Sequence, residues 1–345
     1  MSSSSIEASW LKAFVKVLEK CAIADSESVV VLTELQTRSD LITLTELALA
    51  QLDRRYYRMV LPPAPHPPGP LVRSSGASLA LTGQPGAVSA LCDADVIIDL
   101  TVEGLMHAAE TASILQSGAR IMNISNEHPE TLSRLLPDES VKDQVKTAVR
   151  QIKQASQMSV ESTAGTSLSV NLKDARTVGV WGWTDRPGTL AHWPGGLVVS
   201  FPAAGSVNGI LVLDAGDLNL TFKRYIESPV TLTIEDDYVV DLQGQGADYA
   251  LMREYLAAFN DKAAYATSHV GWGMNPAARY EAMTIYDKAN TNGTELRAVA
   301  GNFLYSTGAN EFAGRFTRGH FDLPVMGCTI ALDDRVVVDK GRLTA

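Results

Sequence analysis

Two side chains near the C-terminus are spaced so that they could bind one metal ion. His320 and Asp322 lie within residues 319–327, a stretch that we expect to form a strand. Side chains two positions apart in an extended strand point to the same face, so the imidazole and the carboxylate would project side by side. Such a pair can supply two of the three ligands of a 2-His-1-carboxylate Fe(II) site. The alternative interpretation is a packed histidine and a surface aspartate at a strand end.

A third ligand has to come from a separate strand, because one strand cannot place three ligands on one face of an octahedron. His269 is a candidate, since it lies in a glycine-flanked strand at residues 268–276. Glycines beside it would let backbone or substrate come close. The sequence therefore allows a metal site that is assembled from two strands far apart in the chain.

Other polar side chains could act beside such a site. His107 is expected at the start of a helix that follows the strand at 94–100, and ligands of open α/β sheets bind at such carboxyl ends. His192 precedes a Trp-Pro-Gly-Gly turn, whereas His66 and His128 lie in loops. Arg297 could bind an anionic substrate, but a surface ion pair with its neighbour Glu295 is the simpler interpretation.

The elements that must position these side chains divide the chain into two parts. In residues 1–158, strands alternate with helices, which predicts a Rossmann-like α/β domain with a mainly parallel sheet. No Gly-x-Gly-x-x-Gly or Walker A motif follows these strands, so a nucleotide site has no motif to support it. In residues 159–345, short alternating runs separated by Gly, Asp and Asn turns predict a mixed, β-rich α+β domain. Helices are expected at 104–116, 248–260 and 277–289.

Composition excludes several classes of protein. The chain has 345 residues, 46% of them hydrophobic, and a formal net charge of −10, which argues against binding to nucleic acid or to an anionic membrane. Three widely spaced cysteines and the absence of Cys-x-x-Cys argue against a zinc ribbon, an iron–sulfur cluster or a disulfide framework. No signal sequence or membrane-spanning stretch is evident. We expect a cytoplasmic enzyme that forms a homo-oligomer.

Three segments of the second half resemble a known enzyme family. They are GHFDLPVMG at 319–327, SHVGWGMNP at 268–276 and the turn FPAAGSVNG at 201–209. These segments are similar to 2,5-dihydroxypyridine 5,6-dioxygenases, which share a fold with the M29 (aminopeptidase T) metallopeptidases. The first half of the chain resembles the family in architecture only.

The resemblance implies a cofactor and a reaction. It implies one non-haem Fe(II) held by His269, His320 and Asp322. Members of this family use O2 to cleave 2,5-dihydroxypyridine between C5 and C6 in an extradiol-type reaction that gives N-formylmaleamate in bacterial nicotinate breakdown. The expected partners are therefore a dihydroxypyridine substrate and O2.

The resemblance also implies roles for four further side chains. His107 and His192 would be the acid–base and hydrogen-bonding groups around the ring, since the histidine pKa lies near neutrality. Arg297 and Met106 would contact the substrate. No obvious substrate-binding glutamate precedes His192, where Asp185 is the nearest acid.

A metallo-aminopeptidase of the same fold is the alternative function. The peptidases use additional glutamates to hold two metal ions, whereas residues 300–306 contain no glutamate. In addition, His269 stands where a peptidase is expected to carry an acid. Both differences favour one iron ion over two zinc or cobalt ions. A third interpretation is a degenerate member that binds a small aromatic acid without turnover.

Overall fold

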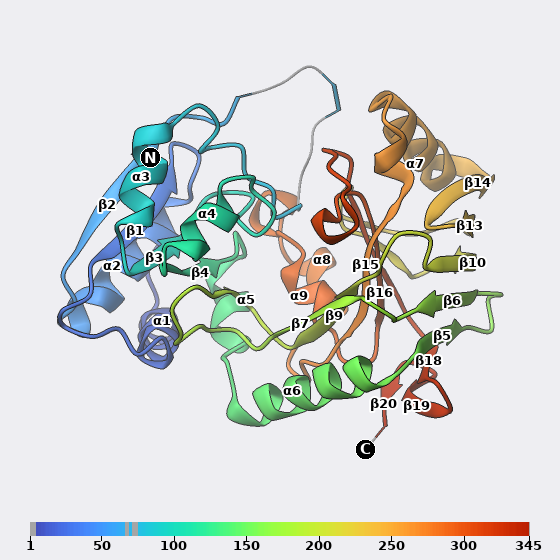
Figure 1. The fold of residues 1–345 in the computed structure, drawn as a ribbon. Helices are drawn as coiled ribbons and strands as arrows, with labels where there is room; N and C mark the ends of the chain where they lie inside the picture. The colour runs from blue at the N-terminus through green and yellow to red at the C-terminus, as the bar shows by residue number, and fades with distance from the viewer. Residues whose placement is uncertain (1–4, 66–68, 71–74, 345) are drawn as a thin grey trace.

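The computed structural model describes residues 5–65, 69–70 and 75–344, so the expected surface position of His66 lies outside the described residues. Within these ranges the chain forms two differently built parts, which lie side by side in Figure 1. The first is a parallel sheet between helices, and the second consists of antiparallel sheets. The predicted fold class, a Rossmann-like layer followed by a β-rich α+β part, is confirmed.

The parallel sheet has five strands in the order β2-β1-β3-β4-β8. Its strands are β1 (Val29–Glu34), β2 (Tyr56–Leu61), β3 (Val96–Asp99), β4 (Arg120–Ile124) and β8 (Leu190–Trp193). The fifth strand comes from beyond residue 158, so the chain returns to this sheet after it has started the second part. The division into domains at residues 158 and 159 stays a prediction, and the sheet itself crosses that boundary.

Helices cover both faces of the parallel sheet. Alternate residues of β1 enter different cores, with Val29 and Val31 on one side and Val30 and Leu32 on the other. A strand that is buried on both faces reads as a continuous apolar run, which explains the local sequence. The helices of this part are α1 (Ala8–Lys20), α2 (Ser39–Gln51), α3 (Pro85–Cys92), α4 (Thr111–Gln116) and α5 (Pro129–Arg134).

The second part contains two large antiparallel sheets. The eight-stranded sheet has the order β14-β13-β10-β6-β5-β18-β19-β20. Its strands are β5 (Gln157–Glu161), β6 (Ser167–Asn171), β10 (Val207–Leu213), β13 (Val230–Glu235), β14 (Tyr238–Gly244), β18 (Thr329–Leu332), β19 (Arg335–Asp339) and β20 (Arg342–Leu343). The five-stranded sheet has the order β17-β16-β15-β9-β7. Its strands are β7 (Arg176–Val180), β9 (Leu197–Phe201), β15 (Thr267–Gly273), β16 (Phe303–Thr307) and β17 (Phe321–Val325).

One large hydrophobic core joins the two antiparallel sheets to α6 (Glu139–Gln154). The buried residues of α6 are Val141, Val145, Ala148 and Ile152, which recur at the spacing of one helical face. Shorter elements complete this part. They are α7 (Gly246–Ala258), β11 (Leu218–Asn219), β12 (Arg224–Tyr225), α8 (Ala282–Ile285), α9 (Thr294–Arg297) and the 3₁₀ turns η1 (Lys262–Tyr265), η2 (Lys288–Asn290) and η3 (Glu311–Ala313).

Two predicted helices are wrong in extent. The helix expected at 104–116 begins only at Thr111, because the Asp99 carboxylate accepts hydrogen bonds from the backbone N–H of Thr101 and of Leu105 and holds this segment in turns. Gly104 has a φ of +79°, which also interrupts a helix. His107 therefore lies in the loop between β3 and α4, not at a helix start.

The helix expected at 277–289 is reduced to α8 and η2. Asn275 accepts a hydrogen bond from the backbone N–H of Ala277, and Glu295 accepts one from that of Arg279, so side chains hold this segment as a loop. Tyr286 has an extended backbone (φ −105°, ψ 148°), which ends α8 at Ile285. By contrast, the helix expected at 248–260 is present as α7. In the described part of the chain, the helices are all too short or too polar to cross a lipid bilayer.

The close approach of β15 to β9 can be tested at one glycine. A Cβ on Gly271 would lie 1.9 Å from the carbonyl oxygen of Val198, which is backbone and cannot swing away. We expect Gly271→Ala to lower the free energy of unfolding by about 2 kcal/mol or more. Gly86 of α3 is the matched control, since a Cβ there meets nothing within 4 Å. Urea unfolding should show Gly86→Ala to be neutral or slightly stabilising, and equal losses in both variants would contradict this account.

Candidate metal centre

The three predicted ligands meet because of the register of three neighbouring strands. His269 of β15 is paired with Ser306 of β16, and Ser306 is paired with Asp322 of β17. Side chains at paired positions lie on the same face of a sheet, so His269 and Asp322 flank Ser306 on one face. His320 directly precedes β17, two residues before Asp322. Residues far apart in sequence are thus brought together across a single intervening strand.

The distances among these three side chains fit one small cation. Their potential ligand atoms all lie within 4.8 Å of one another, and all three residues are buried. Nε2 of His269 is 3.8 Å from Oδ1 of Asp322, and Nε2 of His320 is 3.2 Å from Oδ2. Two imidazole nitrogens and one carboxylate form a donor set that suits a divalent transition metal.

The carboxylate of this group is held in its charged form. Oδ2 of Asp322 accepts a hydrogen bond from Nε of Arg297 at 2.5 Å, and Oδ1 accepts one from the hydroxyl of Ser306. Burial alone would raise the pKa of Asp322, but Arg297, His320 and His269 together hold that pKa well below its ordinary value. An ionised carboxylate keeps lone pairs free for a metal ion.

His269 is held in the neutral form that a metal requires. Burial lowers the pKa of His269 to about 3, although the charge of Asp322 acts in the opposite direction. Its Nδ1 is buried, and no hydrogen-bond partner for it is found among the described residues. A neutral buried imidazole beside an ionised carboxylate is a donor arrangement that a bound cation would complete.

Arg297 is placed by a contact between the two parts of the molecule. Glu127, which follows β4, is buried and accepts hydrogen bonds from the backbone N–H of Asn292, Gly293 and Thr294 at 3.0, 2.8 and 2.8 Å. This carboxylate therefore fixes the start of α9, the short helix that ends at Arg297. The surface pair expected between Arg297 and Glu295 is wrong, because Arg297 is buried against Asp322.

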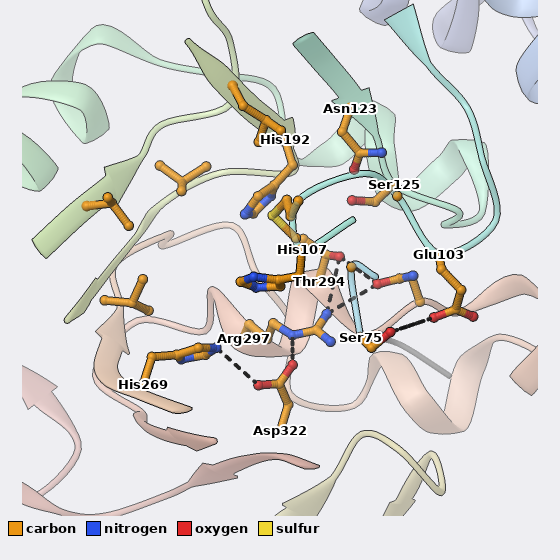
Figure 2. A pocket seen from close by; sticks show the side chains of 18 of the residues that line it. Ser75, Glu103, His107, Asn123, Ser125, His192, His269, Thr294, Arg297 and Asp322 are labelled. Atoms are coloured by element: carbon orange, nitrogen blue, oxygen red, sulfur yellow. Dashed lines mark hydrogen bonds and ion pairs between the residues drawn. The ribbon is translucent and has the colours of Figure 1, made fainter. Parts of the chain in front are cut away.

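A pocket of about 300 Å³ opens onto this group of side chains between the two parts of the molecule. Figure 2 shows Arg297 and Asp322 below the rings of His107 and His192. The lining includes all seven site residues that the sequence predicted, namely Met106, His107, His192, His269, Arg297, His320 and Asp322. Asp185 is exposed and is not in this lining, and His128 instead caps α5 by accepting from the backbone N–H of Glu130.

His192 has a defined tautomer. Its Nδ1 lies 2.7 Å from the carbonyl oxygen of Pro194, which can only accept, so Nδ1 carries the proton and Nε2 is left as an acceptor. Burial lowers the pKa of His192 to about 4, and its ring is therefore neutral near pH 7. β8 carries this residue to the edge of the parallel sheet, where the pocket begins.

His107 reaches the pocket from the loop after β3. Its ring stacks on that of His269 with centroids 6.5 Å apart and an interplanar angle of 16°. Its Nδ1 is 3.8 Å from Oε1 of Glu311, and this contact lowers the pKa of Glu311. Met106, next to it in sequence, lies against Gly76 and also belongs to the lining.

Sequence reasoning missed several polar residues of the lining, among them Ser75, Glu103, Asn123, Ser125, Thr294 and Glu311. Asn123 and Ser125 lie at the carboxyl end of β4, so the rule that placed His107 at a strand end could also have found them. Glu311 lies in a 3₁₀ turn with no distinctive pattern, and its position depends on tertiary structure alone.

Comparisons with known proteins agree with this geometry. Residues 9–345 match the family model NicX, described as 2,5-dihydroxypyridine 5,6-dioxygenase. The 2,5-dihydroxypyridine 5,6-dioxygenase of Pseudomonas putida (strain KT2440) is 36% identical over 336 residues, which cover 96% of this chain and 95% of the relative. The solved structure of 2,5-dihydroxypyridine dioxygenase from the same strain superposes with a TM-score of 0.93 at 35% identity, covering 99% of each chain.

A more distant structure shares the fold alone. Wild-type AmpT from Thermus thermophilus superposes with a TM-score of 0.67 at 12% identity, covering 98% of this chain and 99% of its own.

The family model and the Pseudomonas putida relative show that the chain is a member of a class of ring-cleaving dioxygenases, which are oxidoreductases. Within that class it belongs to the 2,5-dihydroxypyridine 5,6-dioxygenase family.

The assignment of ligands predicts which substitutions remove a metal ion. We expect His269→Ala, His320→Ala and Asp322→Ala each to lose a bound divalent metal, because each removes one of three donors. His107→Ala should retain about one ion per chain. His128→Ala, which changes a histidine outside the pocket lining, is the matched control. Elemental analysis after anaerobic loading and desalting measures the ratio, and loss of metal from His107→Ala would show that the donor set is different.

The buried neutral state of His192 predicts a pH dependence of stability. Its pKa is about 4 in the folded chain, against 6.5 for an unperturbed histidine. Below pH 6.5 the unfolded chain binds the proton first, so this residue's contribution to stability is complete above pH 6.5 and is lost as the pH falls toward 4. The loss amounts to about 3 kcal/mol. Urea unfolding of the metal-free protein should therefore show that the free energy of unfolding falls less steeply with decreasing pH in His192→Gln than in the wild type. Parallel plots of this free energy against pH for the two proteins would refute the prediction.

Proposed function

We propose that the chain is an Fe(II)-dependent dioxygenase that cleaves 2,5-dihydroxypyridine between C5 and C6 to give N-formylmaleamate. The observation that carries this proposal is the convergence of His269, His320 and Asp322 on one pocket. Membership of the family over residues 9–345 supports the substrate and the reaction. The overall change adds both atoms of O2 to the ring carbons, so no further reductant is needed.

The donor set supports iron as the metal. Two imidazoles and one carboxylate leave coordination positions open, as in 2-His-1-carboxylate Fe(II) oxygenases. Bound Fe(II) would supply the redox chemistry that activates O2 and would favour the ionised form of a hydroxyl beside it. A second metal site has little support, since residues 300–306 contribute Ser306 to Asp322 and no carboxylate.

His192 and His107 are the proposed proton-handling groups. The Pro194 carbonyl fixes the proton of His192 on Nδ1, so Nε2 can accept a hydrogen bond or a proton from a substrate hydroxyl. His107 faces the same pocket from the loop after β3, stacked on His269. Both rings belong to the parallel-sheet part of the molecule, opposite the metal ligands.

Arg297 and Met106 are the proposed substrate contacts. The Nε of Arg297 donates a hydrogen bond to Asp322, and its Nη1 donates one to the Asn292 side-chain oxygen at 3.2 Å. The guanidinium is thus rigid, so it would meet the substrate as a fixed positive charge next to the metal carboxylate. Met106 belongs to the pocket lining, where its thioether would offer an apolar contact to the ring.

Oxygen consumption tests the proposed reaction. Protein loaded anaerobically with Fe(II) should consume about one O2 per 2,5-dihydroxypyridine, with loss of the pyridine absorbance and appearance of N-formylmaleamate. Zn(II)-loaded protein is the control and should be inactive, since zinc has no redox chemistry.

A different set of results would support the aminopeptidase alternative. In that case Fe(II) protein would consume no O2 with the pyridine, and protein loaded with Zn(II) or Co(II) would release N-terminal residues from a peptide. Binding of the pyridine without either activity would instead identify a degenerate member of the family.

A further inference from the structure

Glu311 is an acidic residue of the pocket lining that comes from η3, in the part of the molecule with antiparallel sheets. Its Oε1 lies 3.8 Å from Nδ1 of His107, and within the described ranges this is the one ion pair that involves His107. The two side chains are 37% and 18% exposed, so the contact is partly shielded from water. It also joins the two parts of the molecule, since Glu311 belongs to η3 and His107 to the loop after β3.

The segment that carries Glu311 is firmly anchored. Asn310 is fully buried, its side-chain amide donates to the Pro202 carbonyl at 2.9 Å, and its side-chain oxygen accepts from the backbone N–H of Ala313 at 3.1 Å. At the other end, Arg315 donates to Asp237 and to the Thr267 carbonyl, both at 2.7 Å. An acid on a segment fixed at both ends is presented in one place, unlike a side chain on a free surface loop.

His107 is constrained in the complementary way. Its backbone N–H donates to the Gly76 carbonyl at 2.7 Å, and its ring is stacked on His269 and meets the edge of Phe201 at 6.1 Å. These contacts fix the plane of the ring but do not decide which nitrogen carries the proton. The Glu311 carboxylate does, because its negative charge 3.8 Å from Nδ1 favours the tautomer whose N–H dipole points toward it.

We propose that Glu311 is a positioning residue that holds His107 in the tautomer with the proton on Nδ1. Nε2 of His107 is then the proton acceptor, as required of a group that takes a proton from a substrate hydroxyl. The outer partner of a catalytic or metal-bound histidine commonly sets its tautomer and orientation in this way. The inference rests on the proposed function for the consequence in turnover, but the tautomer itself can be observed without any reaction.

The first test is spectroscopic and uses the metal-free protein. Histidine ring ¹⁵N shifts, recorded at about pH 8 where histidine is neutral, should show His107 in the Nδ1–H form, with its signals assigned from their absence in His107→Ala. In Glu311→Ala the same signals should move toward the Nε2–H form. Glu254→Ala is the matched control, because Glu254 is an exposed acid that pairs with Arg253 on α7. An unchanged tautomer in Glu311→Ala overturns the inference.

The second test is a double-mutant cycle with the Fe(II)-loaded enzyme. Glu311→Ala should lower kcat about 10-fold while KM and iron content stay close to those of the wild type. In the His107→Ala background, Glu311→Ala should have no further effect, because the residue acts through His107. Equal effects in both backgrounds would show a purely structural role and overturn the inference.

The two proposals fail in distinguishable ways. If wild-type protein does not turn over 2,5-dihydroxypyridine but the ¹⁵N shifts respond to Glu311→Ala, then the tautomer assignment holds and the proposed function is wrong. If turnover is normal and neither the shifts nor kcat respond, then Glu311 has no positioning role.

Discussion

The arrangement of the candidate metal centre depends on one buried carboxylate, that of Asp322. Removing a carboxylate from water costs several kcal/mol unless its charge and lone pairs are compensated. Asp322 gains that compensation from three residues: Arg297 at the end of α9, Ser306 on β16 and His320 just before β17. The ionised state of Asp322 therefore requires these segments to be assembled together.

The two parts of the chain contribute different chemistry to the pocket. The antiparallel sheet supplies the donors of the candidate metal centre, and rigid pairing of β15, β16 and β17 fixes the spacing between them. The parallel sheet supplies His192 on β8 and His107 after β3. A ligand bound between them would lie between the candidate metal ligands on one side and two imidazole rings on the other. In the proposed mechanism, metal binding and proton transfer would therefore be carried out by different layers.

The sequence predicts those features of the site that depend on residues close together in the chain. The i, i+2 spacing of His320 and Asp322 is a property of one strand, and glycines mark the strand of His269, so all three could be proposed without a structure. Burial of Arg297 could not, because it depends on Glu127 from another part of the chain. The helix expected at 104–116 was wrong for a local reason that periodicity does not reveal, because the Asp99 carboxylate accepts a hydrogen bond from the backbone N–H of Leu105, six residues further along.

The hydrogen bonds of Glu127 also link the movements of the two layers. This side chain follows a strand of the parallel layer, yet it holds the first backbone N–H groups of α9 in the other layer. A tilt of one layer against the other would therefore pull on α9 and carry Arg297 with it. Because Arg297 is bonded to Asp322, such a tilt would alter the electric field at the carboxylate. Any such tilt would therefore change the shape of the pocket and its electrostatics together.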